Sequence, residues 1–369
     1  MKTRRSTRLS GLGGLVIPYA RPLLAIFLAL LVSAVFIIYR GANPLEAYKA
    51  MLEGAFGSRA GLANTGVRAT PLLLGGLAVA VGWQAGLLNV GIEGQIYLGG
   101  IFSTAIAISP LPVPPWLHLL IAIIAGFIGG VVWGLIPAFL KAYRGISEIV
   151  VTLMLNYVAI QLTSLVVHEP SPLAKKDAFY PQSPIILPSA QLPILIKGTS
   201  LHAGLIIGLV LGVVIYFVLR YTNFGFRIRM LGGNINAARY TGINVRRLMF
   251  VVILISAGIG GLGGVGEVLG LKLALYDYFV VGLGYDSIAV ALMANGHPLG
   301  VIATSIFFGA LRAGAGKMQV VAGIETPIAA VIQALAVLFV IGLGFAKVGR
   351  GSWREKKEDE AKEVLAHGE

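Results

Sequence analysis

The chain consists mainly of apolar runs that are each long enough to cross a lipid bilayer, separated by short polar or proline-rich turns. Pro22–Tyr39, Trp116–Leu140 and Leu201–Leu219 are clear examples. A membrane-spanning helix needs about 20 apolar residues, and hydrocarbon offers no partner for backbone amides, so such runs must be helical. With 57% hydrophobic and only 12% charged residues, the composition is not that of a soluble globular protein. The sequence therefore predicts an all-α polytopic membrane protein.

The distribution of basic residues predicts which loops face the cytoplasm, because Lys and Arg gather on that side of a membrane. Residues 1–21 carry five Lys and Arg and residues 220–247 carry six, and neither segment contains an acid. We expect both segments and the charged tail 346–369 in the cytoplasm, with the proline-rich loop 168–200 outside. The membrane domain then covers 22–345, with about ten transmembrane helices and both termini on the cytoplasmic side of the cell membrane.

Two stretches are harder to assign as complete transmembrane helices. Residues 41–67 mix charged and apolar side chains, and the part that begins at Pro44 is predicted to be a short interfacial helix on the outer face. Residues 280–311 are glycine-rich and interrupted by Asn295 and Pro298, so short or re-entrant helices are an alternative to full spans there. The net charge of +13 lies at the ends of apolar runs, which favours membrane lipid over nucleic acid as its partner.

Polar side chains interrupt the apolar sequence at residues 85–100, where Asn89, Glu93 and Gln95 lie at the expected depth of lipid. Ionisable groups at that depth are costly and usually mark a solute pathway or a gate. The alternative is that Glu93 caps a helix or packs between helices and touches no solute. Asp286 also lies between glycines and apolar residues, and it has the same two interpretations, including a cap on the helix 287–293.

The cytoplasmic loop contains the pattern of a short, separately capped helix. Asn234 suits the N-cap, Ala237 and Ala238 favour helix, and Gly242 suits the left-handed residue that ends it. Such a helix, with arginines on both sides, would be a docking element for another protein. The alternative is that the arginines only contact anionic lipid headgroups.

Several site types are excluded. Residues 258–263 match the spacing of a dinucleotide fingerprint, but they lie in an apolar run without a strand before them, and residues 314–317 lack the Ser or Thr of a phosphate-binding loop. The chain is therefore not expected to hydrolyse ATP. There is no cysteine, and the histidines lack ligand spacing, so we assign no metal, no catalytic residues and no cofactor.

Four motifs in order, GLLNVGIEGQI (86–96), MLNY (154–157), GGNINAARYTG (232–242) and GYDSIAVAL (284–292), resemble permease subunits of ATP-binding-cassette importers. The resemblance runs from about residue 22 to residue 345. Within these importers, the chain is similar to the branch that serves simple sugars and nucleosides, and within that branch to the nucleoside permeases. The resemblance implies a fold like that of the cobalamin importer, in two inverted halves at about 70–167 and 248–345. Inverted repeats place the solute path where the halves meet.

The resemblance also implies partners: an ATPase subunit, expected as tandem domains, a second permease subunit and an extracellular solute-binding lipoprotein. The ATPase would act on a coupling helix made from Asn234, Asn236, Ala237, Ala238, Arg239, Tyr240 and Gly242. Amide, hydroxyl and aromatic groups suit a neutral solute, and the residues predicted for its path or gate are Asn89, Glu93, Gln95, Tyr97, Asn156, Tyr157, Tyr285, Asp286 and Asn295. For the tyrosines the alternative is the aromatic belt at the membrane surface. The competing function is an ion-coupled secondary transporter or channel that acts alone.

Overall fold

The structure is a computed structural model, and it describes residues 13–324, 327–328, 330–340 and 342, with side chains from residue 24 onward. The described residues form helices joined by turns and loops, of which the longest connects α6 and α7. Their only strand-like pairing is two isolated bridges, Gln182 with Tyr276 and Ile194 with His202. The all-α prediction is confirmed. Residues 1–12 and the whole of the tail 346–369 lie outside the described residues.

The helices have the following bounds: α1 (Gly13–Tyr39), α2 (Pro44–Phe56), α3 (Arg59–Gln84), α4 (Ile92–Ala107), α5 (Pro115–Arg144), α6 (Glu148–Val167), α7 (Gly204–Tyr221), α8 (Asn223–Gly233), α9 (Ile235–Tyr240), α10 (Val245–Val265), α11 (Leu283–Met293) and α12 (Pro298–Ala322). A 3₁₀ turn, η1 (Pro188–Ala190), lies in the loop 168–200, and a π-helical segment, η2 (Gly266–Lys272), extends α10. A further apolar helix covers Ala330–Val340.

Six helices are long and apolar enough to span a membrane within the described residues: α3, α5, α6, α7, α10 with η2, and α12. The pair α1 and α2 meets the same test together but is bent by 116° between Tyr39 and Pro44, which gives a seventh span if it is counted as one. The total of ten is therefore not confirmed and stays a prediction. The helix predicted from Pro44 is present as α2, where Asn43 caps it by accepting from the Leu45 amide at 3.0 Å.

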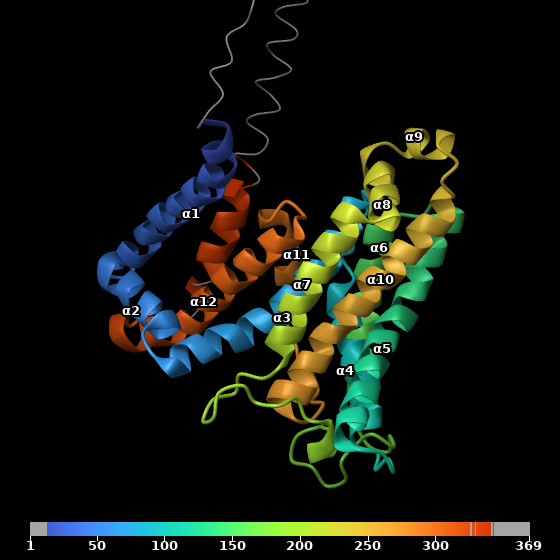
Figure 1. The fold of residues 1–369 in the computed structure, drawn as a ribbon. Coiled ribbons are helices and arrows are strands. Elements are labelled where there is room, and N and C mark those ends of the chain that lie inside the picture. Colours follow the sequence, from blue (N-terminus) through green and yellow to red (C-terminus); the bar gives the residue numbers. More distant parts are fainter. Residues whose placement is uncertain (1–12, 325–326, 329, 341, 343–369) are drawn as a thin grey trace, which may run out of the picture.

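Figure 1 shows the arrangement of these elements. Helices α4, α5 and α10 pack side by side, α3 runs through the centre of the molecule, and α12 packs on α2 and α3. Helix α3 is the most enclosed span, with nearly every residue from Thr65 to Gly82 buried. The short helix α9 lies at one end of the molecule and the loop 168–200 at the other (Figure 1).

The two halves repeat one order of elements. Helix α3 is followed by a break at residues 85–91 and the short helix α4, and α10 with η2 is followed by a break at 273–282 and the short helix α11. Each short helix has an acid in its first turn, Glu93 in α4 and Asp286 in α11. The two acids that the sequence singled out therefore lie at the start of comparable short helices. In the stretch 280–311, the structure has one short helix and then the complete 25-residue helix α12.

Candidate functional site

The break at residues 85–91 is held by a buried group of amides. The Asn89 amide nitrogen donates to Gln95 Oε1 at 3.0 Å and to Ser256 Oγ at 2.8 Å, and Gln95 Nε2 donates back to Asn89 Oδ1 at 3.0 Å. Ser256 on α10 in turn donates to the Ala78 carbonyl on α3 at 2.6 Å. Every polar group in this set has a partner inside the protein, so in this conformation the amides fix the break between α3, α4 and α10. The contribution of Ser256 was not expected from the sequence.

Glu93 caps the N-terminus of a helix far away in the sequence. Its carboxylate oxygens accept from the backbone amides of Gly282 at 2.7 Å and Gly284 at 2.6 Å, at the start of α11. The side chain is only 2% exposed. A Cβ on Gly284 would lie 2.2 Å from the Glu93 backbone nitrogen, so α11 can approach α4 this closely only because residue 284 is glycine. The arrangement agrees with the helix-capping alternative for Glu93 and joins the short helices of both halves.

Asp286 has different partners from those expected of an N-cap. Its carboxylate forms an ion pair with Arg312 on α12 and accepts from Gln333 Nε2 at 2.7 Å, in the helix Ala330–Val340. The residue lies inside the first turn of α11, not before it. Asp286 therefore ties α11 to the two following helices, and the predicted cap on 287–293 is replaced by this contact.

Asn156, near the middle of α6, holds the start of α4. Its amide nitrogen donates to the Val90 carbonyl at 2.9 Å and to the Tyr285 hydroxyl at 3.3 Å, while its oxygen accepts from the Gly94 amide at 2.9 Å. Tyr97 performs a similar function one turn further along α4, where its hydroxyl donates to the Val280 carbonyl. These two side chains fix the backbone on both sides of the contact between α4 and α11.

The structure thus brings most of the predicted path residues together, and places two of them elsewhere. Tyr157 is 60% exposed, beside the buried Asn156. Asn295 is exposed in the turn between α11 and α12 with a positive φ of 50°. Among the described residues, neither side chain hydrogen-bonds to the group around Glu93. Tyr285 is 39% exposed, so its ring is accessible while its hydroxyl meets Asn156.

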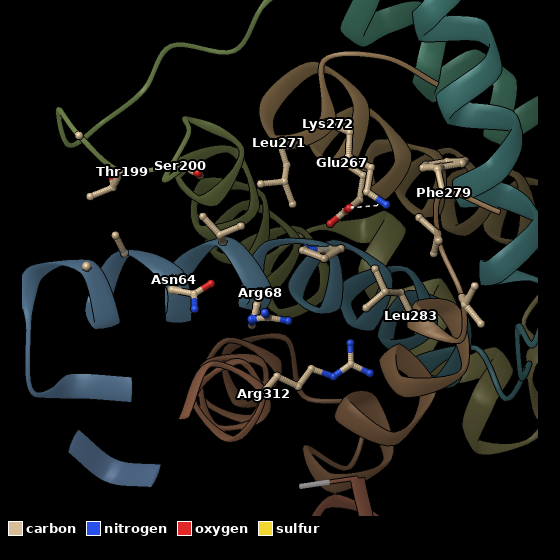
Figure 2. Close-up of a pocket in the computed structure, with 17 residues that line it drawn as sticks. Asn64, Arg68, Thr199, Ser200, Glu267, Leu271, Lys272, Phe279, Leu283 and Arg312 are labelled. Carbon is tan, nitrogen blue, oxygen red and sulfur yellow. Dashed lines mark ion pairs between the residues drawn. The ribbon is translucent and has the colours of Figure 1, made fainter. Parts of the chain in front are cut away.

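A cavity of about 620 Å³ lies beside this group, at the end of the molecule that carries the loop 168–200. We call it the loop-side cavity. Its lining residues come from α3, the loop, η2, the break at 273–282 and α12 (Figure 2). The polar ones are Asn64, Arg68, Thr199, Ser200, Glu267, Lys272 and Arg312. Leu283, the first residue of α11, also lines it, so the cavity ends at the helix that Glu93 caps.

Charged side chains face one another across the loop-side cavity (Figure 2). Lys272 pairs with Glu267 at 3.7 Å, and its ammonium lies 5.5 Å from the centroid of the Phe279 ring. Arg312 is the partner of Asp286. The sequence interpretation missed Arg68, Glu267, Lys272 and Arg312. The signal was present, because each is an ionisable residue inside or beside an apolar run, and such residues at membrane depth usually face a cavity.

The short helix predicted in the loop 220–247 is present as α9, with the predicted caps. Asn234 Oδ1 accepts from the amides of Asn236 at 2.9 Å and Ala237 at 3.1 Å, and Gly242 has a positive φ of 79°. Ala238 is the buried residue of α9. Asn236, Arg239 and Tyr240 are exposed, Tyr240 at 93%.

The last turn of α8, which leads into α9, touches the break between α3 and α4. A Cβ on Gly232 would lie 2.3 Å from the Gln84 carbonyl oxygen and 3.0 Å from the Gly86 nitrogen. Gly86 itself has a positive φ of 72°, and its own added Cβ would lie 3.3 Å from Gly232. Backbone therefore packs on backbone between the segment that leads into α9 and the segment that leads into Glu93.

Residues 61–342 match the family model described as the permease component of the branched-chain amino acid transport system. The chain belongs to this family. It is a transport component, and its apolar helices are those of a multi-pass protein of the plasma membrane.

Three relatives are similar in sequence to this chain over most of its length. A guanosine ABC transporter permease protein of Bacillus subtilis is 32% identical over 86% of this chain and 92% of its own length. A glucose ABC transporter permease protein of Haloferax volcanii is also 32% identical, over 89% and 88%. A nucleoside ABC transporter permease protein of Lactococcus lactis is 30% identical, over 92% and 97%. These relatives favour the ABC importer permease over a transporter that acts alone.

Proposed function

We propose that this chain forms the translocation path of an ATP-driven nucleoside importer. The observation that carries the proposal is the continuous connection from α9 to the loop-side cavity. Gly232 contacts Gly86 from the last turn of α8, which leads into α9. The break at 85–91 leads into Glu93, and Glu93 caps α11, whose first residue lines the cavity. A displacement of α9 would therefore be transmitted to α11 through closely packed backbone segments.

The proposed partners are those that the resemblance to ABC importer permeases implies. An ATPase subunit would act on the exposed surface formed by Asn236, Arg239 and Tyr240. Ala238, on the buried side of α9, packs the helix against the rest of the protein. A tandem-domain ATPase, a second permease subunit and a solute-binding lipoprotein on the side of the loop 168–200 complete the proposed importer. Both termini of this chain would then be cytoplasmic, and the chain itself would carry out no hydrolysis.

A nucleoside is favoured as the solute for two reasons. The relatives from Bacillus subtilis and Lactococcus lactis are named for guanosine and nucleosides. The loop-side cavity has a volume within the range of small-molecule sites and presents amide, hydroxyl and charged groups that can bind a nucleobase.

The test is reconstitution of the chain in liposomes with its ATPase subunit and binding protein. We expect uptake of radiolabelled guanosine that requires ATP and stops when the ATPase carries a Walker-site substitution. Uptake of glucose but of no nucleoside would contradict the assigned solute. Transport by this chain without an ATPase, under an ion gradient, would contradict the importer itself.

A further inference from the structure

One cation of the loop-side cavity, Arg68, has neither a hydrogen bond nor an ion pair with any other described residue. Lys272 pairs with Glu267 and Arg312 pairs with Asp286, but among the described residues Arg68 makes no hydrogen bond and no ion pair. It lies on the exposed face of α3, one turn from Asn64, and its guanidinium points into the cavity between Glu267 and Arg312 (Figure 2).

The remaining charges restrict what Arg68 can bind. The cavity is lined by three cations, Arg68, Lys272 and Arg312, and one acid, Glu267. Two guanidiniums that face the same space repel each other, so a solute with hydrogen-bond acceptors on that side is favoured. The Glu267 carboxylate faces the cavity from η2, opposite α3, and it favours donors on the other side of the solute while it repels a phosphate.

Guanine has this distribution of groups. Its O6 and N7 atoms are adjacent acceptors that a guanidinium can bind with two hydrogen bonds, and its N1–H and 2-amino group are donors. Adenine presents an amino group in place of O6, which would face the donors of Arg68. We propose, on the basis of the nucleoside function above, that the loop-side cavity selects 6-oxopurine nucleosides. Arg68 binds O6 and N7, and Glu267 accepts from the 2-amino side of the base.

The experiment compares solutes within the complete importer, with the same binding protein throughout, so that any change of preference comes from the permease. Uptake is measured for guanosine, inosine, adenosine and 7-deazaguanosine. A bidentate contact of this type discriminates by roughly 5- to 100-fold. We expect guanosine and inosine to be preferred over adenosine, and 7-deazaguanosine to lose about tenfold because it lacks the N7 acceptor.

Two substitutions in the cavity, one matched control and one conservative variant locate the preference. Arg68→Gln should lower the guanosine-to-adenosine uptake ratio about tenfold, since glutamine pairs with adenine N6 and N7. Glu267→Gln should lower guanosine relative to inosine, which has no 2-amino group. Arg59→Gln is the matched control, because it makes the same change on the same helix outside the cavity and should leave both ratios unchanged. Arg68→Lys, which keeps the charge without the fork, should also reduce the preference and serves if the glutamine variant does not insert.

Several results would overturn the proposal. Equal ratios in Arg68→Gln and Arg59→Gln, or equal uptake of guanosine and 7-deazaguanosine, would remove the assignment of the base site while nucleoside import stood. Stronger competition by a nucleoside monophosphate than by guanosine would show that Arg68 binds a phosphate. Failure of the wild-type importer to take up any nucleoside would instead refute the function on which this inference rests.

Discussion

Replacing Glu93 tests whether the contact between α4 and α11 determines the stability of the transport-competent structure. Its carboxylate accepts two backbone hydrogen bonds of 2.7 and 2.6 Å and is 2% exposed. A hydrogen bond to a charged group contributes about 1.5–3 kcal/mol, and negative charge at a helix N-terminus adds about 0.3–1 kcal/mol. Glu93→Gln keeps one acceptor oxygen but turns an amino group toward the other backbone amide, so we expect a loss of about 2 kcal/mol. Glu93→Ala leaves both amides unpaired and should cost about 4 kcal/mol.

The assay is the free energy of unfolding in mixed micelles, measured by SDS titration, together with uptake in liposomes. The maximum uptake rate should fall in both variants, in the order alanine below glutamine, while membrane insertion is retained. Glu46→Gln is the control, because it makes the same change on the exposed face of α2. An unfolding free energy for Glu93→Gln within about 0.5 kcal/mol of the wild-type value, with normal uptake, would refute the positioning role.

Three further predictions follow from single contacts. Gly232→Ala should uncouple ATP hydrolysis from uptake, because its Cβ would lie 2.3 Å from the Gln84 carbonyl oxygen. Gly233→Ala is the control and should not uncouple them, because its Cβ would have no atom within 4 Å. Equal ratios of ATP hydrolysed to solute taken up in the two variants would contradict the proposed transmission. Asn234→Ala should weaken α9 by about 1 kcal/mol and reduce solute-stimulated ATPase activity, and Asn234→Ser should restore most of it; unchanged stimulation in the alanine variant would argue against docking at α9. Burial lowers the pKa of His202 to about 4, and its Nδ1 accepts from the Gly204 amide. Because the unfolded state then binds more protons between about pH 6.5 and 4, the free energy of unfolding should fall as the pH drops through that range, and less steeply in His202→Gln.

The helices and the caps of α9 follow from local sequence, so both can be predicted from it. Asn234 and Gly242 act on backbone groups within a few residues of themselves, so their positions in the sequence are enough to place the ends of α9. The apolar runs similarly require helices, since lipid provides no other partner for the backbone. The number of spans does not follow from local sequence in the same way, because a bend such as the 116° angle between α1 and α2 depends on packing.

The function of each polar side chain was decided by the tertiary structure. Glu93 and Asp286 occupy equivalent positions in their sequence motifs, yet one caps a helix whose amides are 189 and 191 residues away, and the other pairs with Arg312. Local sequence alone is enough to identify an all-helical membrane protein with a capped short helix in the loop 220–247 and polar breaks within its apolar runs. That these breaks meet at α11 and that Arg68 faces a cavity follows only from the packing of the helices, because both depend on long-range contacts that no local pattern encodes.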